Sequence, residues 1–210
     1  MTLPSLQVQF VYAHLAWGVV LAACGTAILA RRKPFPVRLG VAWVILMVAC
    51  NALPGNISLA YWLGFAFQSP SALLVAYCVA AVWQHLHRRV GDRLLSTGAA
   101  LTIVGVGGLL YVDAAGLLHL GLYTHGYGGM AAGVALTVGT LAAIAVNAGP
   151  DHRAARAVLF AVTLFALWRL PTGNAWDAFL DPWLFLWALA TLIARGVAGR
   201  ARQLSTGSAC

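Results

Sequence analysis

The chain has 210 residues, of which 61% are hydrophobic and 9% are charged, and its formal net charge is +8. Soluble domains carry about 25% charged residues, so this composition excludes an ordinary water-soluble globule and predicts one domain embedded in a lipid bilayer. We expect an all-α polytopic membrane protein rather than a β-barrel. Residues 134–146, VALTVGTLAAIAV, are apolar on every side, whereas the strands of a membrane barrel alternate apolar and polar residues.

Seven apolar blocks follow one another along the chain, at residues 7–30, 38–53, 70–87, 94–112, 129–148, 154–169 and 182–198. A helix needs about 20 residues to cross the hydrocarbon core of a bilayer, so these blocks predict seven transmembrane helices. No basic residue precedes the first block, and RRKP follows it. This arrangement indicates an anchoring helix rather than a cleaved signal peptide.

Basic residues gather in alternate connections between the blocks. Twelve of the thirteen follow the first, third, fifth and seventh blocks, in four clusters: Arg31, Arg32, Lys33 and Arg38; Arg88, Arg89 and Arg93; Arg153 and Arg156; Arg195, Arg200 and Arg202. The positive-inside rule then places the N-terminus outside and the C-terminus in the cytoplasm. The charge is therefore expected to meet anionic lipid headgroups on the cytoplasmic side and not nucleic acid. We expect a multi-pass protein of a bacterial inner membrane.

A short sequence pattern around the second block recurs around the sixth. Residues 53–56 read LPGN and residues 170–174 read LPTGN, while the third and seventh blocks both begin at a proline, Pro70 and Pro182, that follows a polar residue. Prolines also follow the first and fifth blocks, at Pro34 and Pro150. The pattern indicates an internal duplication with both copies in one orientation.

The duplication divides the single transmembrane domain into a three-helix half at residues 1–93, a linker helix at residues 94–112 and a second half at residues 129–202. A division into three hairpins after an anchor helix fits less well, because its middle unit lacks the proline and the asparagine. The 3+1+3 plan resembles the architecture of SWEET-type sugar transporters, whose halves are also parallel. No sequence motif accompanies this resemblance.

Three segments on the predicted outer side, residues 54–69, 113–128 and 170–181, hold most of the uncommon polar residues. Within them, residues 57–67 and 117–123 are too short and too apolar for a span or an exposed loop, and they predict re-entrant or interfacial pieces. We predict a substrate site in these segments and at the boundary residue Arg169, formed by Asn56, Asp113, Arg169, Asn174, Trp176 and Asp177.

Each of these residues has a structural interpretation beside the functional one. Asn56 and Asn174 are either turn residues or a symmetric pair of ligand contacts. The aromatic residues of the segments form either an interfacial belt or a stacking surface. Asp181 precedes a proline, which is typical of a helix N-cap.

Arg169 is the basic residue that breaks the positive-inside pattern. It either reaches lipid phosphate from the membrane edge or pairs with Asp177 or Asp113 around a polar cavity, because charges at this depth usually face a partner or a water path. Eight residues separate Arg169 from Asp177, with a proline and a glycine between them, so the chain can fold back to form the pair.

The sequence predicts no cofactor and no firm metal site. His119 and His125 are weak metal candidates, since His-x5-His is not a standard zinc spacing; ordinary interfacial hydrogen bonding suits them better, and a proton relay is a further alternative. Lys33 is the single lysine and lies in a connection, which excludes a retinal Schiff base. His14 lies inside the first block and needs a partner in the bundle, but no second histidine lies at a matching depth for haem.

These features favour a small transporter or permease with an outward-facing polar site between two helical halves. Two alternatives stand beside it: a membrane-embedded enzyme acting on a lipid-linked substrate at the outer leaflet, and a structural subunit of a larger membrane complex. The expected partners are the bilayer, a small solute or a lipid-linked substrate, and another membrane protein or further copies of the chain. A cavity between the halves favours transport, and convergent Asp and His side chains favour an enzyme.

Overall fold

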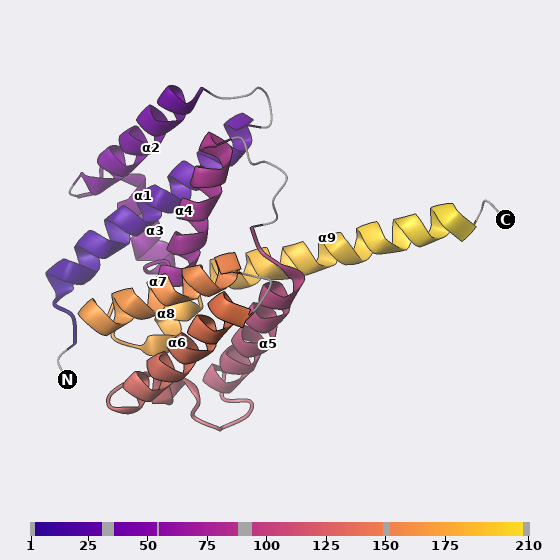
Figure 1. Ribbon diagram of the computed structural model, residues 1–210. Helices are drawn as coiled ribbons and strands as arrows, with labels where there is room; N and C mark the ends of the chain where they lie inside the picture. The colour runs from indigo at the N-terminus through magenta and orange to yellow at the C-terminus, as the bar shows by residue number, and fades with distance from the viewer. Residues whose placement is uncertain (1–2, 31–35, 54, 88–93, 149–151, 208–210) are drawn as a thin grey trace.

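The computed structural model describes residues 3–30, 36–53, 55–87, 94–148 and 152–207. Regular structure in these residues is entirely helical, as expected for an all-α protein. The elements are α1 (Leu6–Ala30), α2 (Val37–Ala52), α3 (Leu59–Phe67), α4 (Ala72–Leu86), α5 (Thr97–Ala114), the 3-10 helix η1 (Tyr123–Gly126), α6 (Met130–Ala148), α7 (His152–Trp168), α8 (Ala175–Phe179) and α9 (Pro182–Gly207). Figure 1 shows their arrangement.

Each of the seven apolar blocks forms a helix, and four of these helices are long and apolar enough to cross a membrane. They are α1, α5, α6 and α9. Helices α2 and α4 are apolar but have 16 and 15 residues, or about 22–24 Å at about 1.5 Å per residue. The structure therefore supports a multi-pass membrane protein with four candidate spans. Helix α3 agrees with the prediction of a short apolar piece at residues 57–67.

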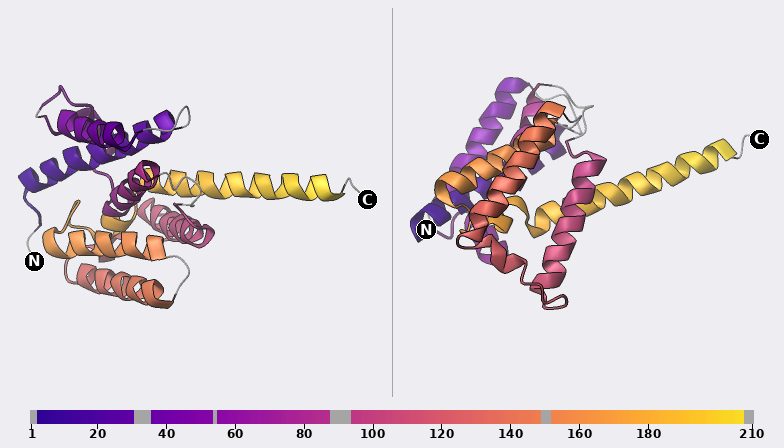
Figure 2. Two further views of the ribbon diagram at one scale, coloured as in Figure 1. Left: turned by 45° about the horizontal axis from the view of Figure 1, so that its top comes forward. Right: turned by 60° about the horizontal axis from the view of Figure 1, so that its bottom comes forward.

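The longer helices pack side by side (Figures 1 and 2). Helix α1 contacts both α2 and α4, α4 contacts α7, α7 contacts α6, and α5 contacts α9. Glycines bring some of these pairs close together. A Cβ atom on Gly25 would lie 2.7 Å from the ring of Trp43, and one on Gly107 would lie 2.9 Å from the ring of Phe185. Small residues let apolar helices approach in a membrane, where packing rather than water exclusion holds them together.

Helix α9 is the least enclosed of the long helices. It begins in the centre of the molecule beside α8, and its C-terminal part extends beyond the other helices in Figures 1 and 2. Leu186, Ile193 and Val197 are all more than half exposed along it. These apolar side chains suit a helix that meets lipid.

The core lies where α4, α7, α8 and α9 meet. Tyr77 of α4, Phe165 of α7 and Leu184 of α9 are at most 2% exposed, and the ring of Tyr77 meets Trp187 edge-on with 5.8 Å between the ring centroids. The alanines of α8 are buried against this core. The segment after α7, which the sequence predicts to be an outer connection, is therefore buried in the protein core.

The order of the elements agrees with the expected duplication, but the packing differs between the two halves, so the duplication is not confirmed. A short helix precedes the last helix of each half, α3 before α4 and α8 before α9. However, α4 packs on α1, whereas α9 packs on the linker helix α5. Pro34, Pro54 and Pro150 lie outside the described residues, so the equivalence of the prolines stays a prediction.

Candidate functional site

Asp113, near the end of α5, organises the connection between α5 and α6. Its side chain is 7% exposed. One carboxylate oxygen accepts hydrogen bonds from the backbone N–H groups of Leu120 (2.7 Å) and Gly121 (3.1 Å), and the other accepts from Leu122 (2.6 Å) and Tyr123 (3.4 Å). The loop is therefore folded around this carboxylate.

Tyr123 links that loop to the segment before α9. Its hydroxyl donates to Oδ1 of Asp177 at 2.7 Å, and the hydroxyl of Thr172 donates to Oδ2 of the same carboxylate. Burial, and then the hydrogen bond to Asp177, raise the pKa of the Tyr123 phenol well above its usual value. The Tyr123 phenol therefore stays protonated and donates its hydrogen bond, and each carboxylate oxygen of Asp177 accepts a hydrogen bond from one hydroxyl group.

Asn174 and Trp176 complete this connection. Asn174 is fully buried; its Oδ1 accepts from the backbone N–H of Trp176 (2.9 Å), which caps α8, and its Nδ2 donates to the carbonyl of Tyr123 (3.3 Å). The indole N–H of Trp176 donates to the carbonyl of Leu122 (2.9 Å). We call Asp113, Tyr123, Thr172, Asn174, Trp176 and Asp177 the polar network.

The structure therefore joins four of the six predicted substrate residues, Asp113, Asn174, Trp176 and Asp177, through the 120–123 loop. Asn174 acts as a helix cap, and this agrees with the turn interpretation rather than the ligand interpretation; a role in substrate binding stays a prediction. Tyr123 and Thr172 were not predicted. Their signal in the sequence is weak, because a single hydroxyl in a loop has no characteristic spacing.

The remaining two predicted residues are Arg169 and Asn56. The Arg169 guanidinium lies over the ring of Phe165, 4.9 Å from its centroid, and its pairing with Asp177 stays a prediction. Asn56 is exposed on the turn before α3, and its carbonyl accepts from the indole of Trp62 at 2.9 Å. The expected symmetry between Asn56 and Asn174 does not extend to their surroundings, because one is exposed and the other fully buried.

The histidines do not converge on a common centre in the part of the chain that the structure describes. Within it, no group of three His, Cys, Asp or Glu side chains is placed to hold a metal ion. His119 and His125 are exposed, and Nδ1 of His125 lies 2.7 Å from the carbonyl of Gly121. His14 is 5% exposed, with Nδ1 2.9 Å from the Phe10 carbonyl of its own helix.

Asp181 is a helix cap, as predicted, and has a second role. Its Oδ1 accepts from the backbone N–H of Leu184 at the start of α9 (2.8 Å), and its Oδ2 accepts from the backbone N–H of Ser71 at the start of α4 (2.8 Å). One buried carboxylate thus ties together the beginnings of two helices that are 110 residues apart in the sequence.

A large groove lies between α4, α5, α6 and α7, and α8 closes one end of it. Its volume is about 1360 Å³. Ser96, His152, Arg153 and Arg156 lie at the end where α5 and α7 begin, and Trp176 lines the α8 end. Trp176 belongs to both the groove and the polar network. The sequence does not predict the groove, since its walls are ordinary apolar helix faces.

A smaller groove of about 550 Å³ lies between α6 and α7, and Arg169 lines it together with Phe165. Its other lining residues are apolar or small, apart from Thr140. Arg169 therefore lies beside a different groove from Trp176.

Comparison with protein-family models, curated proteins and solved structures finds no match to this chain. The site is therefore interpreted from its own geometry.

Proposed function

We propose that the protein is a small membrane permease in which the large groove is the path of the substrate. One observation carries this proposal. The groove begins at the basic end of the bundle and ends at Trp176, and hydrogen bonds of the polar network hold this tryptophan against the opposite connection. A path that is closed at one end is what a transporter needs in one of its two states.

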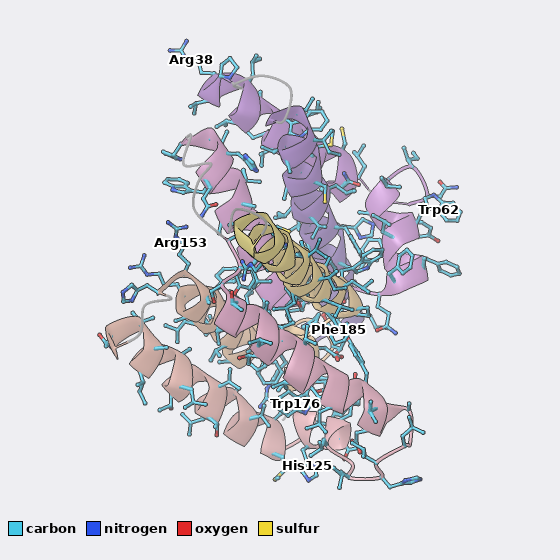
Figure 3. The ribbon with its side chains drawn as sticks, turned by 90° about the vertical axis from the view of Figure 1, so that its right-hand side faces the viewer. Arg38, Trp62, His125, Arg153, Trp176 and Phe185 are labelled. Carbon is cyan, nitrogen blue, oxygen red and sulfur yellow. The ribbon has the colours of Figure 1, made fainter. Side chains whose placement is uncertain are left out.

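The membrane placement that accompanies this proposal has seven spans, with the N-terminus outside and the basic ends in the cytoplasm. The guanidinium of Arg195 donates to Oγ1 of Thr97 at 2.8 Å, so the middle of α9 lies at the start of α5. The groove brings the start of α7 to the same place. Figure 3 places Arg38 and Arg153 on one side of the molecule and Trp62 on the other. Two basic residues from different connections thus lie on the same side of the molecule, which supports the positive-inside arrangement.

Helices α2, α4 and α7 are shorter than the roughly 20 residues of a typical span. Their outward faces nevertheless carry large exposed apolar side chains, among them Val41, Ile45, Val79 and Phe160. Such faces are stable in lipid and costly in water, where each Å² of apolar surface costs about 25 cal/mol. We therefore infer that these three helices also cross the bilayer.

The polar network closes the α8 end of the groove through hydrogen bonds that are weak enough to break. Three hydrogen bonds join the 122–123 loop to the segment around α8: Tyr123 to Asp177, Trp176 to Leu122 and Asn174 to Tyr123. Neutral hydrogen bonds contribute about 0.5–1.5 kcal/mol each and those to a charged group about 1.5–3 kcal/mol. Their sum is a few kcal/mol, which is the scale on which a protein exchanges between two conformations.

The enzyme alternative has less support in the described residues. It requires aspartates and histidines that act together, yet four backbone N–H groups surround the carboxylate of Asp113 and two hydroxyls occupy that of Asp177. His125 turns to a backbone carbonyl of its own loop. The groove favours transport instead.

The topology is tested by labelling introduced cysteines with a membrane-impermeant thiol reagent in intact cells, after the native cysteines are replaced. We expect Thr124→Cys to be labelled from outside, and Val90→Cys only after the membrane is opened. Labelling of both from the same side would contradict the placement.

Transport is tested with purified protein in liposomes and a panel of small solutes and labelled lipids. Val106→Trp places a large side chain in the groove, whereas Leu101→Trp is a matched change at an exposed position of α5 outside the groove. We expect the first variant to abolish movement of the transported compound and the second to retain it. Equal activity of both variants would show that the groove is not the path.

A further inference from the structure

The groove has the length of one membrane leaflet. On α5 its lining runs from Ser96 to Val106, and the ten residues 97–106 measure about 15 Å at about 1.5 Å per residue. The hydrocarbon core of a bilayer is about 30 Å thick. A ligand that fills the groove from end to end therefore reaches from one surface of the bilayer to about its middle.

The wall of the groove is apolar along this length. Leu73 of α4, Val106 of α5, and Val138 and Leu141 of α6 line it, and Phe179 and Leu180 close the α8 end. An apolar wall of this kind binds a hydrocarbon chain, and it offers few partners to a sugar or an amino acid, whose polar groups need hydrogen bonds when they leave water.

The opposite end of the groove is basic. His152, Arg153 and Arg156 from the first turns of α7 line it, together with the hydroxyl residues Ser96 and Thr97. Arg195 adds a third guanidinium next to this end through its bond to Thr97. None of the residues that line the groove in the described chain is acidic. Arginine forms paired, charge-assisted hydrogen bonds with phosphate.

We propose that the groove binds a phospholipid with a net negative headgroup from the cytoplasmic leaflet, with the phosphate at Arg153 and Arg156 and an acyl chain directed towards Trp176. The separation of charge and apolar surface along one groove matches the two parts of such a molecule. This inference rests on the proposed function, because it names the class of compound that the permease takes up. Binding and movement are nevertheless separate properties that can be measured apart.

Binding is measured on the full-length protein in an uncharged detergent, by native mass spectrometry and by thermal stability. The probes are phosphatidylglycerol and phosphatidylcholine with identical acyl chains. We expect phosphatidylglycerol to bind at least about tenfold more tightly, because its single negative charge is not offset by a choline. Equal binding of the two lipids would overturn the proposal.

Variants locate the bound lipid. Arg153→Gln/Arg156→Gln should weaken phosphatidylglycerol binding by about tenfold or more, whereas Arg38→Gln, an exposed arginine at the start of α2 outside the groove, should leave it unchanged. Val106→Trp should exclude the acyl chain, and Leu101→Trp should not. If the double arginine variant and Val106→Trp both bind as tightly as the unchanged protein, the lipid lies elsewhere and the proposal is wrong.

A soluble competitor separates recognition of a lipid from recognition of a phosphate alone. Glycerol 3-phosphate carries the headgroup chemistry without the chains, and we expect it to compete at least about a hundredfold more weakly than phosphatidylglycerol, since the acyl chains contribute most of the buried apolar area. Equal competition would refute the lipid. Specific lipid binding without transport would refute the permease and leave this inference standing. Transport of a soluble solute without lipid binding would refute this inference and leave the permease standing.

Discussion

The double role of Asp181 makes a prediction that the sequence alone would not make. Replacement by alanine removes both the cap of α9 and the acceptor for the Ser71 N–H at the start of α4. Replacement by asparagine retains an oxygen for Leu184 but turns an amide donor towards Ser71. Ser96 is the matched control, because its hydroxyl accepts from the backbone N–H of Ala99 and its role at α5 is that of a single cap.

The magnitudes follow from the number of acceptors lost. Loss of a cap costs about 0.5–2 kcal/mol, and a buried donor left without a partner costs about 1–3 kcal/mol. We therefore expect a loss of about 3 kcal/mol for Asp181→Ala, about 2 kcal/mol for Asp181→Asn and about 1 kcal/mol for Ser96→Ala. For a protein of this length each kcal/mol lowers the melting temperature by about 2–4 °C, so Asp181→Ala should melt about 6–12 °C lower.

The assay is thermal unfolding of the purified variants in one detergent, followed by tryptophan fluorescence. Trp183 lies two residues from Asp181 in the sequence, and its ring meets that of Trp17 edge-on with 6.3 Å between the centroids, so two of the eight tryptophans lie close to the junction. If Asp181→Ala were no less stable than Ser96→Ala, the bond to Ser71 would contribute nothing. If Asp181→Asn matched the unchanged protein, the acceptor argument would also be wrong.

Three further predictions concern the polar network. Gly126→Ala should destabilise the protein by about 1–3 kcal/mol, because a Cβ there would overlap the Asn174 side chain. Gly129→Ala is the control, since a Cβ at that position meets nothing within 4 Å and should leave the stability unchanged. Equal melting temperatures of the two variants would contradict the close packing of η1 on α8. The raised pKa of Tyr123 should add stability that is complete below about pH 10, where an unfolded tyrosine ionises, and is lost as the pH rises further. Stability measured from pH 8 to 12 should show this fall, and Tyr123→Phe should show a smaller fall than the unchanged protein. If Arg169 and Asp177 pair, the double variant Arg169→Gln/Asp177→Asn should lose less stability than the sum of the losses of the two single variants, with a coupling of about 0.5–3 kcal/mol. Strictly additive losses would favour Arg169 as a lipid anchor.

The sequence by itself determined where the helices form and where several of them begin. An apolar segment in a bilayer has no water to satisfy its backbone, so it must form its own hydrogen bonds, and each apolar block became a helix for that reason. The Asp181-Pro182 step fixed the start of α9 because a carboxylate and a proline suit the first turn of any helix. Asp113, Asn174, Trp176 and Asp177 were recognised as a group because polar residues are rare in this chain.

The tertiary structure decided which faces of the helices meet. A helix that is apolar on every side has no separate hydrophobic face that identifies which side packs against other helices. An apolar face is also as stable against lipid as against another helix. For this reason the sequence could not show that α9 packs on α5 instead of α6, or that a groove opens between α5 and α7. It also could not show that the Asp113 carboxylate is surrounded by the N–H groups of residues 120–123, because a loop conformation depends on contacts that close only when the chain is folded.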